Sequence, residues 1–379
     1  MDIVSALLPR YYRVNSSSSS SSSSAEIFPV TWLPGFVAAP GYLKYDERIG
    51  VSMCASSEMA VRSLLQRHQE EKQPLGVRVL DLCCCPGMKF NSMADKLRPG
   101  DELMGIDVNE RRMQTCISIV RKQLMNRHAF AHCILVIADG TTFTGPCSVD
   151  NEQGEVVFDS DILLDELEDM RKRGRKRINK SAKSREKKRL KQSANHITSI
   201  CGTSTFDFVL VDAECSHDGS YRHLATMTEK PNALAIYEAE DRDAKMNALQ
   251  CKLLSNGFKF LKPNGVLIYS TCRYLFFLPF FSTYNFSKWT LFLCFSLKPE
   301  QNEHVISWLL ETQPDAARAS MRFPCESLQT QLLRVHSLDP LHSLAVEFLS
   351  SDEEVSSRVV ALCQADEDLL LSLSRCPPM

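Results

Sequence analysis

Val266-Leu267-Ile268-Tyr269-Ser270-Thr271-Cys272 is the stretch of sequence from which the fold can be worked out. It follows Lys262-Pro263-Asn264-Gly265, in which Pro, Asn and Gly each favour a tight turn. The apolar, partly β-branched run predicts a short buried strand that ends at two hydroxyls and a thiol. Because ligands of open parallel sheets bind beyond the carboxyl ends of the strands, we expect Cys272 to lie at a functional edge.

Four earlier segments have the same apolar character and alternate with segments that predict helices. They are residues 77–82, 103–107, 134–139 and 206–212. The alternation predicts an α/β fold with a doubly wound, mostly parallel sheet. Right-handed crossovers would then bring all five carboxyl ends to one edge.

The predicted sheet lies within a central domain that we place at residues 46–345. Residues 1–45 are expected to form a weakly structured extension, because nine consecutive serines from Ser16 to Ser24 cannot bury apolar area. Residues 346–379 form an acidic tail. A helix is predicted to begin at Ser56-Ser57-Glu58, whose hydroxyls either cap the helix or contact a ligand.

Residues 150–200 are an insertion with two blocks of opposite charge. Residues 159–169 are acidic, and residues 171–191 hold thirteen Lys or Arg and a single acid, Glu186. One interpretation is a solvated, partly disordered loop whose two blocks attract each other. The alternatives are an arm that binds RNA phosphates or a nuclear import signal, so the nucleus and the cytoplasm both remain possible locations.

Composition and cysteine spacing limit the possible classes of protein. The 379 residues are 44% hydrophobic and 24% charged, with a net charge of -2, as in ordinary globular proteins. Fifteen cysteines occur without a C-x-x-C spacing, which argues against a structural zinc site, and we expect no metal. No charged segment followed by an apolar core opens the chain, so we expect an intracellular protein with reduced thiols.

Carboxylates stand at or near the ends of three successive predicted strands. Asp81, Asp107 and Asp139 suit a ligand that carries a nucleoside, since a strand-end carboxylate can accept ribose hydroxyls. The alternative is that each aspartate caps the following helix. The turn after Asp81 contains Pro-Gly but lacks G-x-G-x-x-G. A ligand without pyrophosphate, such as S-adenosylmethionine, therefore fits better than a dinucleotide.

Two cysteines follow the last two predicted strands. Cys215 comes just after Asp212, and Cys272 ends the following strand. If these strands are neighbours, both thiols can share one pocket. A thiolate attacks electron-poor carbon, whereas a buried cysteine is otherwise an inert small hydrophobic residue.

Five motifs in this chain resemble those of the Nop/Sun RNA cytosine-5 methyltransferases, in the order found in that family. They read D-L-C-C-C-P-G-M-K, G-I-D, A-D-G-T, D-F-V-L-V-D-A-E-C-S and L-K-P-N-G-V-L-I-Y-S-T-C, and the likeness spans roughly residues 30–310. The resemblance implies a Rossmann-like fold of the class I methyltransferase type, S-adenosylmethionine as cofactor and RNA (tRNA or rRNA) as substrate. It implies cofactor-binding roles for Cys83, Cys84, Cys85, Pro86, Gly87, Met88, Lys89, Asp107, Asp139 and Asp212. It also implies that Cys272 is the nucleophile, Cys215 helps to release product, and Asp212 orients the base.

The chain departs from this family most sharply after Thr271-Cys272. Residues 273–295 form an insert with seven of the 19 phenylalanines of the chain. Our preferred hypothesis is a translated intron, because removing the insert joins Cys272 to Ser296 as the family motif requires. A real insertion is the alternative, and it would displace the catalytic loop. Smaller departures are Met88, where the family usually has Gly, and Glu214, where it usually has Pro.

Two other functions therefore stay open beside the methyltransferase. A catalytically impaired family member would still bind RNA. A small-molecule methyltransferase of the same fold would need neither Cys215 nor Cys272.

Overall fold

The computed structural model defines the central sheet, its helices and a small N-terminal sheet. The structure describes residues 10–14, 27–30, 33–39, 52–70, 76–125, 130–145, 154–173, 180–200, 205–216, 240–271, 288–293, 301, 303–313 and 316–318. The serine run, Cys272 and the acidic tail lie outside these residues.

Eight strands form one large sheet in the order β11-β10-β9-β8-β4-β5-β6-β7. The strands are β4 (Arg78–Asp81), β5 (Glu102–Asp107), β6 (His132–Ile137), β7 (Glu155–Asp159), β8 (Phe206–Asp212), β9 (Leu261–Ser270), β10 (Lys288–Leu293) and β11 (Ala316–Arg318). All neighbours are parallel except β6 and β7. The predicted fold class is confirmed, and all five predicted strands are present.

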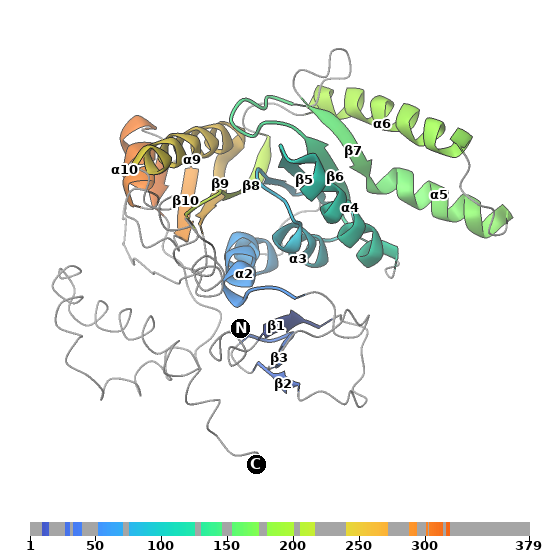
Figure 1. The fold of residues 1–379 in the computed structure, drawn as a ribbon, viewed down its shortest axis with the longest axis horizontal. Helices are drawn as coiled ribbons and strands as arrows, with labels where there is room; N and C mark the ends of the chain where they lie inside the picture. Colours follow the sequence, from blue (N-terminus) through green and yellow to red (C-terminus); the bar gives the residue numbers. More distant parts are fainter. Residues whose placement is uncertain are drawn as a thin grey trace, which may run out of the picture.

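Helices cover both faces of this sheet (Figure 1). The helices are α2 (Ala55–Glu70), α3 (Met88–Lys96), α4 (Glu110–Met125), α5 (Ser160–Arg173), α6 (Lys180–Ile200), α9 (Glu240–Phe260) and α10 (Glu303–Thr312). Alternate strand residues enter two separate hydrophobic cores: Val79 packs in the core with α2, α3 and α4, while Leu80 packs in the core with α9 and α10. This two-residue period is what burial on both faces of a sheet requires.

The turn predicted before the fifth strand lies inside it instead. Residues 262–265 lie inside β9, which begins at Leu261. The pairing with β8 shifts register between Phe206 and Phe208, and Asn264 takes a positive φ of 63°. The turn-forming residues therefore produce an irregularity within the strand, because Asn tolerates the left-handed conformation that a bulge needs.

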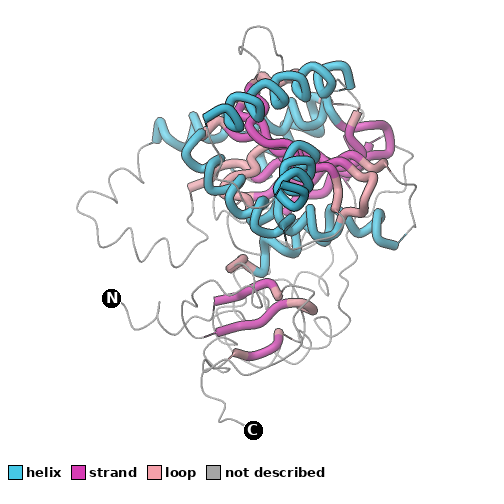
Figure 2. Tube along the Cα trace, turned by 90° about the vertical axis from the view of Figure 1, so that its right-hand side faces the viewer, coloured by secondary structure: helices cyan, strands magenta, loops and turns pink. Residues whose placement is uncertain are grey.

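The N-terminal extension contains a three-stranded sheet, so the expectation of a weakly structured segment is wrong for its described residues. The strands β1 (Arg10–Arg13), β2 (Phe28–Pro29) and β3 (Phe36–Ala39) are antiparallel in the order β1-β3-β2. Figure 2 shows this sheet as a separate layer beneath the helices of the larger domain. Arg13 ties it to that domain through Asp95 and Gln123.

The charged insertion is also more ordered than a loop. It supplies the edge strand β7 and the helices α5 and α6. Arg189 of α6 pairs with Asp165 of α5, as expected for two blocks of opposite charge that attract each other. Ile162 and Leu163 are buried, which explains why the segment folds in spite of its charge.

The described part of the aromatic insert, residues 288–293, forms β10. Because β10 is parallel to β9 and pairs Leu293 with Ser270, the chain returns to the sheet edge at which β9 ends. The translated-intron hypothesis is not decided by this topology and stays a prediction. Among the described helices, none is long and apolar enough to span a bilayer.

Candidate active site

A cavity of about 560 Å³ opens at the carboxyl edge of the sheet. Its volume lies within the range of about 300 to 1,000 Å³ that is common for small-molecule sites. All ten residues predicted to bind the cofactor line it: Cys83, Cys84, Cys85, Pro86, Gly87, Met88, Lys89, Asp107, Asp139 and Asp212. The structure thus brings together residues from four strand ends, while their role in holding a cofactor stays a prediction.

The turn between β4 and α3 forms one wall of the cavity. The backbone N–H of Cys85 donates to Asp107 Oδ2 over 3.2 Å, and Arg112 donates to the Cys85 carbonyl. Gly87 has a φ of +105°, and a Cβ there would lie 2.7 Å from Cys116 Sγ. Glycine is therefore required for both the conformation and the close packing against α4.

Asp107 and Asp139 both organise local backbone as well as lining the cavity. Asp107 Oδ1 accepts the N–H of Asn109 over 2.8 Å, and burial raises the pKa of Asp107. Asp139 Oδ1 accepts the N–H of Thr141 over 2.8 Å and its hydroxyl over 2.7 Å. The capping role and the ligand role proposed for these residues are thus compatible.

Asp81 ends β4 and is fully buried. Its Oδ1 accepts the N–H of Cys83 over 3.3 Å, whereas its Oδ2 has no hydrogen-bond partner among the described residues. Burial, followed by the nearby Asp212 charge, raises the pKa of Asp81 well above its usual range. A carboxyl group in this environment favours the protonated form.

Lys89 and Asp212 join the first turn of α3 to the end of β8. Lys89 Nζ donates to Asp212 Oδ2 over 2.7 Å. Burial alone would lower the pKa of Lys89, but the Asp212 carboxylate raises it, so the ammonium is retained. The pair places a carboxylate and a hydrogen-bond donor together on the cavity wall.

The segment that carries Cys215 is held at the sheet edge by two glutamines. Gln250 of α9 donates to the Glu214 carbonyl over 2.8 Å, and Gln301 accepts the N–H of Ser216 over 2.9 Å. The Cys215 side chain is buried and is not among the residues that line the cavity. A role in product release would therefore require this thiol to become accessible.

Cys272 lies outside the described residues, but its two predecessors do line the cavity. Ser270 is the last residue of β9, and Thr271 follows it. Asp212 of β8 pairs with Ser270 in the parallel register. The prediction that the fourth and fifth strands are neighbours is confirmed. The chain leaves β9 beside the Lys89–Asp212 pair, and the placement of Cys272 stays a prediction.

Two contributions to the site could not be predicted from the sequence. Ser52, Met53 and Cys54, from before α2, line the cavity and carried no recognisable motif. Gln301 follows the aromatic insert, and its carbonyl accepts the Tyr269 hydroxyl over 2.7 Å. The helix predicted at Ser56 begins at Ala55, and Ser57 lines the cavity, so contact with a ligand remains open for its hydroxyl.

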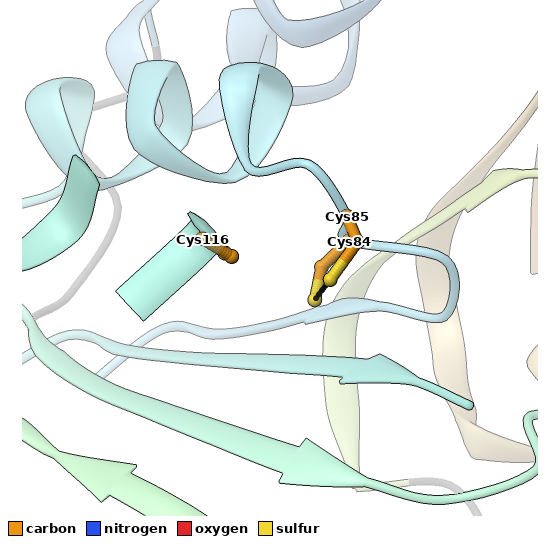
Figure 3. A group of neighbouring side chains, drawn as sticks. All are labelled: Cys84, Cys85 and Cys116. Carbon is orange, nitrogen blue, oxygen red and sulfur yellow. Dashed lines mark hydrogen bonds between the residues drawn. The ribbon is translucent and has the colours of Figure 1, made fainter. Parts of the chain in front are cut away.

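Three thiols gather behind the cofactor turn (Figure 3). Cys84 and Cys85 come from the turn and Cys116 from α4, and their sulfur atoms all lie within 4.8 Å of one another. Hydrogen bonds from Cys84 and Cys85 lower the pKa of Cys116 to about 6, and the hydrogen bond to Cys116 raises that of Cys85 to about 12.

Comparisons with known proteins agree with the motifs. Residues 169–276 match the family model described as 16S rRNA methyltransferase RsmB/F, which confirms the resemblance to the Sun-family enzymes. This range contains Asp212, Cys215 and Cys272, whereas the turn at residues 83–89 lies before it.

The curated relatives match this chain over only part of their own length. It is 24% identical over 305 residues to ribosomal RNA small subunit methyltransferase B of Klebsiella pneumoniae, a match that covers 80% of this chain and 46% of the relative. It is 33% identical over 111 residues to ribosomal RNA small subunit methyltransferase F of Escherichia coli, a match that covers 29% of this chain and 17% of the relative. The chain therefore spans less than half the length of these curated relatives. A solved methyltransferase homolog protein from Pyrococcus horikoshii is 20% identical, covers 82% of this chain and 72% of its own, and has a TM-score of 0.44.

Proposed function

We propose that this chain is an S-adenosylmethionine-dependent RNA cytosine-5 methyltransferase that acts on tRNA or rRNA with Cys272 as its nucleophile. The observation that carries the proposal is the parallel pairing of β8 and β9, which sets Asp212 opposite Ser270. The segments that lead to Cys215 and Cys272 therefore leave the sheet at one edge, beside a cavity of suitable size. The match to the RsmB/F family model covers both segments.

The residues that line the cavity fit a methyl donor that carries a nucleoside. Asp107 ends β5 at the position from which a carboxylate accepts ribose hydroxyls, and the Pro86-Gly87 turn lets backbone approach the ligand. Ser270 lines the cavity with a buried hydroxyl oxygen that has no hydrogen-bond partner in the part of the chain that the structure describes. When bound, S-adenosylmethionine supplies an electrophilic methyl group.

The chemistry assigned to the chain follows from the electronic structure of cytosine. C5 is too weak a nucleophile to accept a methyl group unaided. The Cys272 thiolate adds to C6, which makes C5 nucleophilic toward the donor methyl group. Asp212, paired with Lys89, holds a proton at N3 and stabilises this adduct. Loss of the C5 proton to a base and elimination of Cys272 then release the methylated ring, with Cys215 assisting.

Binding of RNA is assigned to the exposed cations of α6. Arg185, Lys187, Lys188 and Lys191 are exposed on this helix. Arg189 and Glu186 of the same helix are engaged in ion pairs with Asp165 and Arg121. Exposed cations on one helix suit contacts with successive phosphates.

A covalent trap tests the proposal. RNA containing 5-azacytidine is incubated with the full chain and with a version that lacks residues 273–295, and adducts are separated by denaturing electrophoresis. We expect an adduct that Cys272→Ala abolishes and that Cys215→Ala retains, because only Cys272 bonds to the base. Cys251→Ala, which changes a half-buried thiol on α9, is the control.

Each other outcome assigns a different function. An adduct that survives Cys272→Ala shows that Cys272 is not the nucleophile. RNA binding without any adduct in either version indicates an impaired family member. Binding of the methyl donor without RNA binding indicates a small-molecule methyltransferase. An adduct formed only by the shortened version shows that the insert displaces the catalytic loop.

A further inference from the structure

Four sulfur atoms meet behind the wall of the cavity. Cys84 and Cys85 come from the turn after β4, while Met113 and Cys116 lie one helical turn apart on α4. Cys84 Sγ and Cys85 Sγ are 4.0 Å apart, and Cys85 Sγ is 4.0 Å from Met113 Sδ. In Figure 3 the Cys84 and Cys85 side chains descend together from the turn, and Cys116 extends toward them from α4.

These separations are close to those that a bound metal ion imposes. A metal about 2.3 Å from each of three sulfur atoms, in a planar triangle, sets the sulfurs about 4.0 Å apart. The three thiol sulfurs already lie within 4.8 Å of one another. Small side-chain rotations are therefore enough to bring all three to bonding distance.

The kind of donor atom selects the kind of metal. Thiolate and thioether ligands favour Cu(I), and three sulfur donors complete its trigonal coordination. A structural Zn(II) site normally has four ligands. Among the described residues, no histidine or carboxylate belongs to this group, and Cys84, Cys85 and Cys116 are each less than 5% exposed, which disfavours water as a fourth ligand.

The surroundings help to offset the negative charge of the thiolates. The Arg112 guanidinium donates to the Cys85 carbonyl and lies close enough to oppose the rise in the Cys85 pKa. The amino end of α3 begins at Met88, just after the turn, and carries the positive end of the helix dipole. If this cluster served only to fill the core, three apolar residues would do so without a nearby guanidinium or helix amino end.

We propose that Cys84, Cys85 and Cys116 form a binding site for Cu(I), with three thiolate ligands and the Met113 thioether alongside. On binding, three Cu–S bonds form, the protons remaining on the thiols pass to solvent, and copper does not change oxidation state. The site needs only residues of this chain, so its test does not depend on the proposed methyltransferase activity.

The test is an anaerobic titration of the full chain with Cu(I) against a chromophoric Cu(I) chelator. We expect one equivalent to bind more tightly than the copper taken up by the other cysteines. Cys116→Ser and Cys85→Ser should each weaken this equivalent by at least about tenfold, the lower end of what loss of a supporting group beside a metal ligand causes. X-ray absorption of the one-equivalent sample should show only sulfur neighbours.

Matched variants separate copper binding from damage to the core. Cys133→Ser changes a buried cysteine of β6 in the same hydrophobic core and should leave the tight equivalent unchanged. Met113→Leu keeps the side-chain volume and removes only the thioether, so it should weaken binding less than loss of a thiolate. Unfolding temperatures measured without copper identify any variant that does not fold. If one cysteine variant fails to fold, Met113→Leu and the other cysteine variant test the copper site.

Three results would overturn the proposal. The first is a tight equivalent that persists in both Cys116→Ser and Cys85→Ser. The second is nitrogen or oxygen among the copper neighbours. The third is tighter binding of Zn(II) than of Cu(I) when the two ions compete for the chain.

Discussion

Lys89 Nζ lies 2.7 Å from Asp212 Oδ2, and this contact joins the cofactor turn to the strand that precedes Cys215. The two side chains are 14% and 27% exposed, so the pair is shielded but still reaches the cavity that both residues line. Asp81 lies close by and is buried, which makes the Lys89 cation important for the charge balance of the site. A carboxylate held in this way can share a proton with a base bound in the cavity.

Replacement of Lys89 by Met should impair methylation more than folding. The Asp212 carboxylate then loses its hydrogen-bond donor and its cation, so its orientation in the cavity changes. If the proposed function is correct, kcat for RNA methylation should fall by about 100-fold or more, as for loss of a proton-transfer group. Single-turnover methylation with radiolabelled donor measures the effect.

The control for this variant is Lys262→Met. Lys262 forms an equivalent ion pair with Asp207 over 2.9 Å, but at the beginning of β8 and away from the cavity. The Lys262→Met variant should change the methylation rate less than about twofold, because exposed ion pairs contribute about 0 to 1 kcal/mol to stability. Equal losses in the two variants would contradict a specific role for Lys89.

Gly87→Ala should destabilise the fold more than the same change at another left-handed glycine. At Gly87 the new Cβ meets Cys116 Sγ at 2.7 Å and Cys116 Cα at 3.2 Å, whereas at Gly35, with φ +83°, no atom of a described residue lies within 4 Å. Gly35→Ala should lower the free energy of unfolding by about 1 to 2 kcal/mol, from backbone conformation alone. Gly87→Ala should cost about 1 to 3 kcal/mol more from overpacking. Denaturant unfolding measures both, and equal losses would exclude the clash.

The central sheet could be predicted because its strands are short apolar runs that end in polar residues. Residues 206–212 were placed correctly to the residue, since Phe206 and Asp212 mark both ends of the run. The helices α5 and α6 could not be predicted in the same way. Their few buried residues, such as Leu163 and Ala194, are scattered among charges, so the charge pattern indicated a loop.

The cavity could be predicted because each of its aspartates stands at or near the end of a strand, and parallel strands share an edge. The three-thiol cluster could not, because Cys116 reaches Cys84 and Cys85 only through the packing of α4 behind the turn. Local spacing shows a metal site only when its ligands are close in sequence. The contact between Gln301 and Tyr269 was hidden for a similar reason, since the aromatic insert separates them.

His68 should make the protein less stable as the pH falls. Its Nε2 lies 3.0 Å from the buried Asp101 carboxylate, and its Nδ1 lies 3.3 Å from Arg98, an arrangement that suits the neutral ring. Burial lowers the pKa of His68, so the unfolded chain takes up a proton first as the pH drops. Its stabilising contribution is complete above about pH 6.5 and declines below it, by up to about 1.4 kcal/mol per pH unit.

The measurement for His68 is the free energy of unfolding at pH 7.5, 6.0 and 5.0. The stability difference between the natural chain and His68→Gln should shrink as the pH falls, because Gln does not titrate. A difference that stays constant over this range would show that the pKa of His68 is not lowered by folding.

His132 should act in the opposite direction. Burial opposes its charge, but the hydrogen bond to Asp159, at 3.0 Å, and the charges of the nearby carboxylates together outweigh burial and raise the pKa of His132. The folded chain therefore holds the proton more tightly than the unfolded chain. This contribution is complete below about pH 6.5 and is lost as the pH rises through the higher pKa of the folded state. His132→Gln should thus lose more stability at pH 6.0 than at pH 8.5, and the reverse order would contradict the assignment.

Neutralising the exposed cations of α6 should weaken RNA binding and reduce its dependence on salt. Arg185, Lys187, Lys188 and Lys191 are changed together to Gln, and affinity for single-stranded RNA is measured from 50 to 300 mM salt. Each lost phosphate contact should reduce the slope of log K against log salt by about 0.7. Arg111, Lys122, Lys252 and Lys259 are exposed on α4 and α9, and their fourfold change to Gln removes the same charge as a control. If both fourfold variants lower the slope equally, the effect comes from net charge, and α6 is not the RNA-binding arm.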